Sequence, residues 1–106
     1  MLLLFAPATS QDVFVQGAPL VGGSNGLFFD AENNLYVAQV LGRAISKINP
    51  ETGEILEQLG EEEGIFFPDD VTVGPDGTLY WADIFLGTVF RRPPGGPSEP
   101  LYPPGS

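Results

Sequence analysis

The sequence predicts an all-β chain, built from two similar four-stranded antiparallel units and followed by a Pro-rich tail. Three observations predict this fold class. A stretch of about 15 residues recurs 44 residues later, and the apolar runs are short and rich in β-branched and aromatic residues. In addition, six of the eleven prolines fall within residues 92–106, where they exclude a central strand. With 106 residues, the chain holds one domain at most, or a piece of one.

The repeat aligns residues 24–38 with residues 68–82. The shared positions are Leu35-Tyr36 with Leu79-Tyr80, Ala38 with Ala82, and the turn pairs Asn33-Asn34 with Asp76-Gly77. The turn pairs hold residues that tolerate a positive φ, as tight turns require. If the second repeat holds one extra residue after this stretch, Gly42 and Gly87 are expected to be equivalent positions. A period near 44 is typical of a β-propeller blade, which holds four short strands in about 40–50 residues.

Each unit is expected to form its strands between turn signals. The expected strands are 26–29, 35–39, 44–48 and 55–59 in the first unit, and 71–73, 79–84 and 88–91 in the second. Leu101-Tyr102 could add one edge strand, Val13–Val15 a further strand near the start, and residues 60–64 are expected to form a charged loop.

These elements divide the chain into four parts. They are an N-terminal segment at 1–12, a blade-like repeat at 13–60, a second and partial repeat at 61–92, and a Pro/Gly-rich tail or edge strand at 93–106. The apolar stretch Met1 to Phe5 is interpreted as an ordinary chain start, with a degraded secretion signal as the alternative. An extracellular or periplasmic location is the one that the sequence favours.

Charge and composition exclude several function classes. Four Lys and Arg stand against 14 Asp and Glu, which gives a formal net charge of −10, so nucleic acids and anionic membranes would be repelled. The chain has no Cys and no His, which removes disulfides, thiolate nucleophiles, the usual zinc ligands and a Ser-His-Asp triad. No run approaches the ~20 apolar residues of a membrane span. We therefore expect no nucleic-acid partner, no membrane span, and no nucleotide, haem or zinc site.

The segments NGLFFDAENNLYVA and PDDVTVGPDGTLYWAD resemble the six-bladed propellers of the gluconolactonase and senescence-marker-protein family. They are also similar to paraoxonase-like, strictosidine-synthase-like and NHL-repeat propellers. The resemblance covers about residues 13–92 and implies two of six blades, so other blades are the implied partners. Three explanations follow: a fragment or truncated chain, which we favour; the ordered part of a longer protein; or several copies that close a ring, with three copies giving six blades.

The resemblance also implies a metal site. In the resembled lactonases and esterases, a Glu, an Asn and an Asp that precede the innermost strands hold a divalent cation, typically calcium. The matching positions here are Asn25 and Asp69, and the family's Glu has no match. Calcium takes ~6–8 oxygens, so further ligands must come from other blades, other copies or water. The alternative is that Asn25 is a turn residue at a strand start and that Asp69-Asp70 forms an ordinary Asx-turn.

Other polar residues have simpler interpretations. Asp30, Asp76 and Asp83 are expected to be solvated turn carboxylates, and Asp69 or Asp70 could accept a proton; no other catalytic residue is identified. Two functions follow from this sequence. The first is a scaffold or interaction module derived from a lactonase-like or esterase-like propeller. The alternative is part of a calcium-dependent hydrolase of lactones or esters.

Overall fold

A computed structural model describes residues 23–102, which form two four-stranded antiparallel sheets. The first sheet consists of β1 (Ser24–Phe29), β2 (Leu35–Gln39), β3 (Ala44–Ile48) and β4 (Ile55–Leu59). The second consists of β5 (Pro68–Val73), β6 (Leu79–Asp83), β7 (Thr88–Arg92) and β8 (Glu99–Pro100). The predicted all-β class with two four-stranded units is therefore confirmed. The strand predicted at Val13–Val15 lies outside the described residues.

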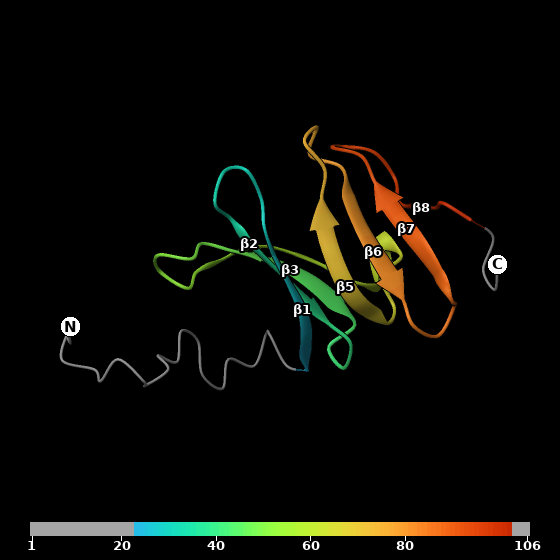
Figure 1. The fold of residues 1–106 in the computed structure, drawn as a ribbon. Coiled ribbons are helices and arrows are strands. Elements are labelled where there is room, and N and C mark those ends of the chain that lie inside the picture. Colours follow the sequence, from blue (N-terminus) through green and yellow to red (C-terminus); the bar gives the residue numbers. More distant parts are fainter. Residues whose placement is uncertain (1–22, 103–106) are drawn as a thin grey trace.

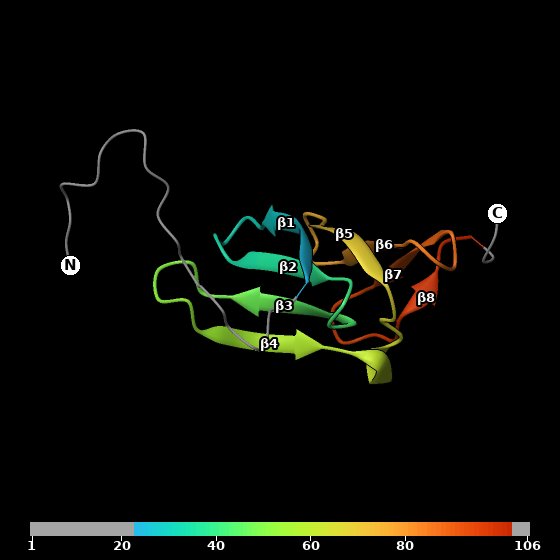
Figure 2. The ribbon, with the colours of Figure 1, turned by 90° about the horizontal axis from the view of Figure 1, so that it is seen from below.

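The strands of each sheet are paired in the order in which they occur in the sequence. The chain leaves the first sheet at β4, one edge strand, and enters the second at β5, which lies beside β1 (Figure 1). Residues 60–67 make this crossing. β1 and β5 are the first strands of their sheets and lie next to each other, and we call them the innermost strands. Figure 2, seen from below, shows β1 to β4 in succession with β4 farthest from the second sheet.

The turns repeat with the strands. Asn33 has φ 66° and Gly77 has φ 92°, and each donates its backbone N–H to a carbonyl three residues earlier, at 3.0 and 2.9 Å. These two residues are 44 positions apart, which agrees with the predicted overlap of the turn positions. A positive φ is tolerated by Asn and costs Gly little.

The second turn of each sheet corrects one predicted match. The turns that follow β2 and β6 both hold four residues, so no extra residue separates the repeats. Arg43, with φ 53°, therefore occupies the place of Gly87, with φ 69°, and the expected match of Gly42 with Gly87 is wrong. A single glycine in a short turn was not enough to fix the register.

The segment at Glu61–Glu63 is a short 3-10 turn instead of the expected loop. The Glu63 carboxylate accepts a hydrogen bond from the Gly60 N–H at 2.7 Å, and Gly64 ends the turn with φ 84°. A carboxylate that returns to the start of a helical turn satisfies a backbone donor there. Glu63, the last of three consecutive glutamates, therefore caps this turn.

The fourth strand of the second sheet lies in the Pro-rich segment. β8 pairs Glu99 with Arg91 and Pro100 with Phe90. It ends just before Leu101-Tyr102, where an edge strand was expected, although the Leu101 N–H still donates to the Val89 carbonyl at 2.8 Å. Proline is tolerated in this strand because an edge strand leaves one side of its backbone without a partner strand.

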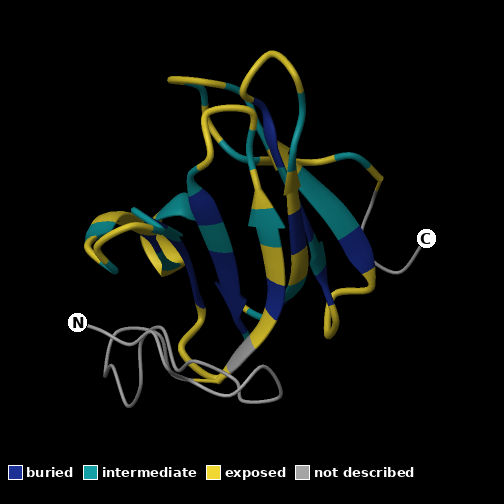
Figure 3. Ribbon diagram, turned by 60° about the vertical axis from the view of Figure 1, so that its left-hand side comes forward, coloured by how far each residue is buried: buried dark blue, intermediate teal, exposed yellow. Residues whose placement is uncertain are grey.

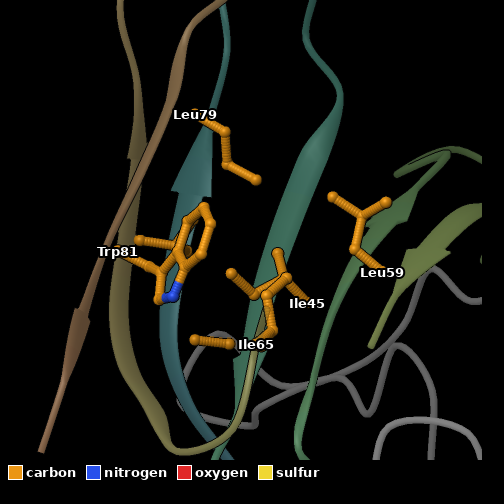
Figure 4. Close-up of a cluster of buried hydrophobic side chains, with 7 residues drawn as sticks. Ile45, Leu59, Ile65, Leu79 and Trp81 are labelled. Carbon is orange, nitrogen blue, oxygen red and sulfur yellow. The ribbon is translucent and has the colours of Figure 1, made fainter. Parts of the chain in front are cut away.

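The main core lies between the two sheets. It consists of Ala38, Ile45, Leu59, Ile65, Val71, Leu79 and Trp81 (Figure 4). Trp81 stacks on Phe90 with ring centroids 5.7 Å apart, and Ile65 from the crossing segment is fully buried against both sheets. Burying an isoleucine side chain fully contributes about 1.5–3 kcal/mol to stability. Buried residues concentrate on the middle strands and exposed ones in the turns (Figure 3).

No helix within residues 23–102 is long and apolar enough to cross a membrane.

Candidate functional site

Both innermost strands begin with a β-bulge at the same place. The pairing of β1 with β2 shifts between Ser24 and Gly26, and the pairing of β5 with β6 shifts between Pro68 and Asp70. The extra residues are Asn25 and Asp69, the two positions for which metal binding was predicted. A bulge turns a side chain away from the regular alternation of a strand and recurs beside functional sites.

The structure brings these two side chains together. The amide Nδ2 of Asn25 donates a hydrogen bond to Oδ1 of Asp69, although 44 residues separate them in the sequence. Asn25 is exposed and Asp69 is half-buried. The neighbouring Asp70 is exposed, and its Oδ1 accepts the backbone N–H of Val71 at 2.9 Å. The site therefore offers an amide group and a carboxylate in contact, with a second carboxylate next in the chain.

Gly26 allows the two innermost strands to approach, a role that was not predicted from the sequence. A Cβ at this position would lie 2.8 Å from both the Asp69 carbonyl oxygen and Oδ1 of Asp70. Such a distance is shorter than any ordinary contact, so only glycine fits. A glycine at the first position of a predicted strand was the available signal, because glycine in a strand often marks close approach of another backbone.

Asp83 lies at the same end of the second sheet, and the prediction made for it is wrong. It is 2% exposed, whereas a solvated turn carboxylate was expected. Its Oδ1 accepts the backbone N–H groups of Phe85 and Leu86 at 3.0 and 2.7 Å, and its Oδ2 accepts that of Phe67 at 3.2 Å. A buried carboxylate is stabilised when it accepts several such bonds. Asp83 therefore ties the crossing segment to the turn after β6.

An aromatic and ionic cluster lies beside this carboxylate. The rings of Phe67 and Phe85 meet edge-on, with centroids 4.2 Å apart. The Arg43 guanidinium lies 4.5 Å from the centroid of Phe67 and forms a 3.1 Å salt bridge with Glu61. The cluster thus joins the turn after β2, the crossing segment and the turn after β6.

The same end of the sheets also exposes large apolar side chains. They are Leu41, Phe66, Ile84, Phe85 and Leu86. Strand directions place their turns at the end where the innermost strands begin, so they form an apolar rim at the end that carries Asn25 and Asp69.

The opposite end holds the two tight turns. Asp30 accepts the backbone N–H groups of Glu32 and Asn34, each at 2.9 Å. Asp76 accepts the N–H and the hydroxyl of Thr78 at 2.9 and 3.0 Å, and these bonds lower the pKa of Asp76. Both residues are turn carboxylates, in accord with the prediction. Within residues 23–102, no three His, Cys, Asp or Glu side chains gather closely enough to hold a metal ion by themselves.

Comparison with solved structures identifies the architecture. A streptogramin B lyase structure matches with a TM-score of 0.68 at 15% sequence identity, over 88% of this chain and 30% of that chain. A hydrazine synthase of Kuenenia stuttgartiensis matches with a TM-score of 0.59 at 16% identity, over 76% of this chain and 24% of that chain. Both are β-propeller proteins. The two sheets are propeller blades.

This likeness concerns the fold alone, because the sequence identities are low. The chain spans less than a third of the length of either solved structure. No protein-family model matches the sequence, and no curated protein matches it either. The particular family that the sequence resembles, and the number of blades in the whole ring, therefore stay predictions.

Proposed function

We propose that this chain acts as an interaction module, a pair of propeller blades whose outward sheet faces bind further blades. The observation that supports this function is the unequal covering of equivalent residues. Val71 on β5 is buried between the two blades, whereas its equivalent on β1, Leu27, is 64% exposed. On the same face, Leu35, Val37 and Ile48 of β2 and β3 are buried, so the apolar area that the first blade offers to a partner lies on β1.

Solution mass tests this function. Light scattering on the full chain should give a mass above 11.3 kDa that falls on dilution, and a trimer near three times that mass would match a ring of six blades. The variant Leu27→Glu should lower the mass, because it places a charge on the exposed face. Leu41→Glu is the matched control, since Leu41 is an 83% exposed leucine in the turn between β2 and β3 and not on a strand. A monomer at every soluble concentration would overturn the proposal.

A second candidate is supported by the pair at the bulges. Asn25 and Asp69 offer amide and carboxylate oxygens, the ligands that a hard cation such as calcium prefers. The donor set fits calcium in kind and is incomplete in number, so the remaining oxygens would come from further blades or water. In this function the assembled protein would hydrolyse lactones or esters, with calcium polarising the carbonyl group when bound.

Calcium titration by calorimetry tests the second candidate separately. Asp69→Asn should weaken calcium binding at least tenfold, and Asn25→Asp should strengthen it, because each changes the charge of the site by one unit. Glu51→Gln removes a charge from an exposed turn and should leave the affinity unchanged. Equal affinities for all four proteins, or no binding by an assembled form, would rule the site out.

A further inference from the structure

Each blade has one face that packs against the other blade and one outer face that does not. The outer face of each blade corresponds, position by position, to the packed face of the other. Every strand residue of β1, β2 and β3 has an equivalent 44 positions later, in the same register. The face of the first blade that packs against the second carries Phe28, Tyr36, Ala38 and Ile45. Its equivalents, on the outer face of the second blade, are Thr72, Tyr80, Ala82 and Val89.

The outer face of the second blade is hollowed. A cavity of about 180 Å³ is lined by Asp70, Val71, Thr72, Tyr80, Trp81, Ala82 and Val89, and most of its surface is apolar. Thr72 stands where the first blade has Phe28, so a small side chain occupies the place of a large one. The hollow lies over β5 and β6, the inner half of the blade.

The outer face of the first blade has a matching ridge. Leu27 and Phe29 on β1 are 64% and 55% exposed. Their equivalents on β5 are Val71 and Val73, which pack in the interface between the two blades. At these two positions the ridge is larger than its equivalents on β5, and it lies on the inner half of its blade. The neighbouring Leu35, Val37 and Ile48 of the same face are buried, so the exposed part of this face is β1.

Large and small side chains exchange places between the packed interface and the proposed contact of the outer faces. Inside the chain, Phe28 of the first blade and Val71 and Val73 of the second pack in the same core cluster. On the outer faces, a threonine would meet a leucine and a phenylalanine, so the total side-chain volume at these positions is nearly conserved. Packed interfaces tolerate volume-conserving exchanges of this kind, and large residues opposite small ones pack well.

We infer that the ridge of one copy, Leu27 and Phe29, docks into the hollow around Thr72 and Tyr80 of a second copy. A second copy is the partner that these surfaces favour, because it carries both of them and because the new contact continues the interface already present between the blades. The contact is heterologous, with unlike faces meeting head to tail, so it forms rings or open chains of copies. This inference rests on the proposed interaction module and names its partner and its contact.

Complementation of two blocked variants tests the pairing. Leu27→Glu blocks the ridge and Thr72→Glu blocks the hollow, and both positions are exposed, so both variants should keep the fold. Each variant alone should be a monomer near 11.3 kDa. An equimolar mixture should form a 1:1 complex of about twice that mass, because each variant keeps the face that the other lacks. Leu41→Glu should associate like the unmodified chain.

Cross-linking gives a second reading, because the chain has no cysteine of its own. Mixing Leu27→Cys with Thr72→Cys under mild oxidation should give the mixed disulfide at least tenfold faster than either symmetric disulfide. Glu51→Cys, on an exposed turn, provides the background rate.

The outcomes separate the two proposals. If the unmodified chain associates but the mixed variants stay monomeric, or if symmetric disulfides form faster, the head-to-tail pairing is overturned and the interaction module stands. If either blocked variant still associates alone, the pairing is also overturned. A monomeric unmodified chain overturns both.

Discussion

Asn25 and Asp69 occupy the same bulge in neighbouring blades, and their side chains form a hydrogen bond across 44 residues of sequence. The contact depends on the close approach of β1 to β5, which places two strand starts side by side. Whatever binds at this end of the blades meets a preformed polar pair.

Replacing Gly26 with alanine should separate the innermost strands. The new Cβ would lie 2.8 Å from a backbone oxygen, which cannot turn aside as a side chain can. We expect Gly26→Ala to lower the free energy of unfolding by about 1–3 kcal/mol, measured by urea denaturation. Gly60→Ala is the matched control, because its Cβ would meet only the Arg43 carbonyl at 3.9 Å. Similar losses from the two variants would contradict the assigned role of Gly26.

Asp83 should be costly to remove. Asp83→Ala leaves three backbone N–H groups without their acceptor, and we expect a loss of about 2–4 kcal/mol in the free energy of unfolding. Asp83→Asn keeps one acceptor oxygen, so its free energy of unfolding should lie between those of the unmodified chain and Asp83→Ala. Denaturant melts of the three proteins measure this order. If asparagine proves no better than alanine, acceptance of the backbone bonds is not what holds this region.

Ile65 should couple the crossing segment to both blades. Its side chain is fully buried in the core between the sheets, so Ile65→Ala leaves a cavity and should cost about 2–5 kcal/mol. Leu41→Ala removes an 83% exposed side chain and should change stability by no more than about 0.5 kcal/mol. Thermal melting followed by tryptophan fluorescence compares the two. A mild effect at Ile65 would mean that the blades pack without the crossing segment.

The turn at Asp76 should contribute to acid sensitivity. Its hydrogen bonds from Thr78 lower the pKa below the ordinary value of 3.8, so the ionised form is favoured in the folded state. Stability from this group is present above pH 3.8 and is lost as the pH falls through the lowered pKa. We expect Asp76→Asn to flatten the dependence of stability on pH below 4, as measured by urea midpoints. An unchanged acid slope would show that these bonds do not couple to folding.

Most of the strand pattern could be predicted from the sequence, because the information is local. Asn33 and Gly77 mark turns through their own backbone freedom, and the β-branched and aromatic runs between turns are short. The match of Gly42 with Gly87 failed because an arginine, not a glycine, holds the left-handed position of the first turn. Arg43 adopts the left-handed conformation in a turn where its side chain also contacts Phe67 and Glu61, and no sequence rule reports such contacts.

The site was predicted in part. A resemblance pointed to Asn25 and Asp69, but the hydrogen bond between them and the need for Gly26 depend on how two strands approach in space. Asp83 was misjudged because its partners are brought to it by the crossing segment, whose N–H at Phe67 is 16 residues away. Burial set by distant segments is the part that local patterns do not contain.

The order of the strands bears on how the protein is made. Every ladder within a blade joins strands that follow one another in the chain, with turns of a few residues between them. Local pairings of this kind form early, so the first blade can complete its hydrogen bonding on the ribosome before the second has emerged. Joining the blades at Gly26 is then a late docking step, which makes that contact the one most exposed to interruption during biosynthesis.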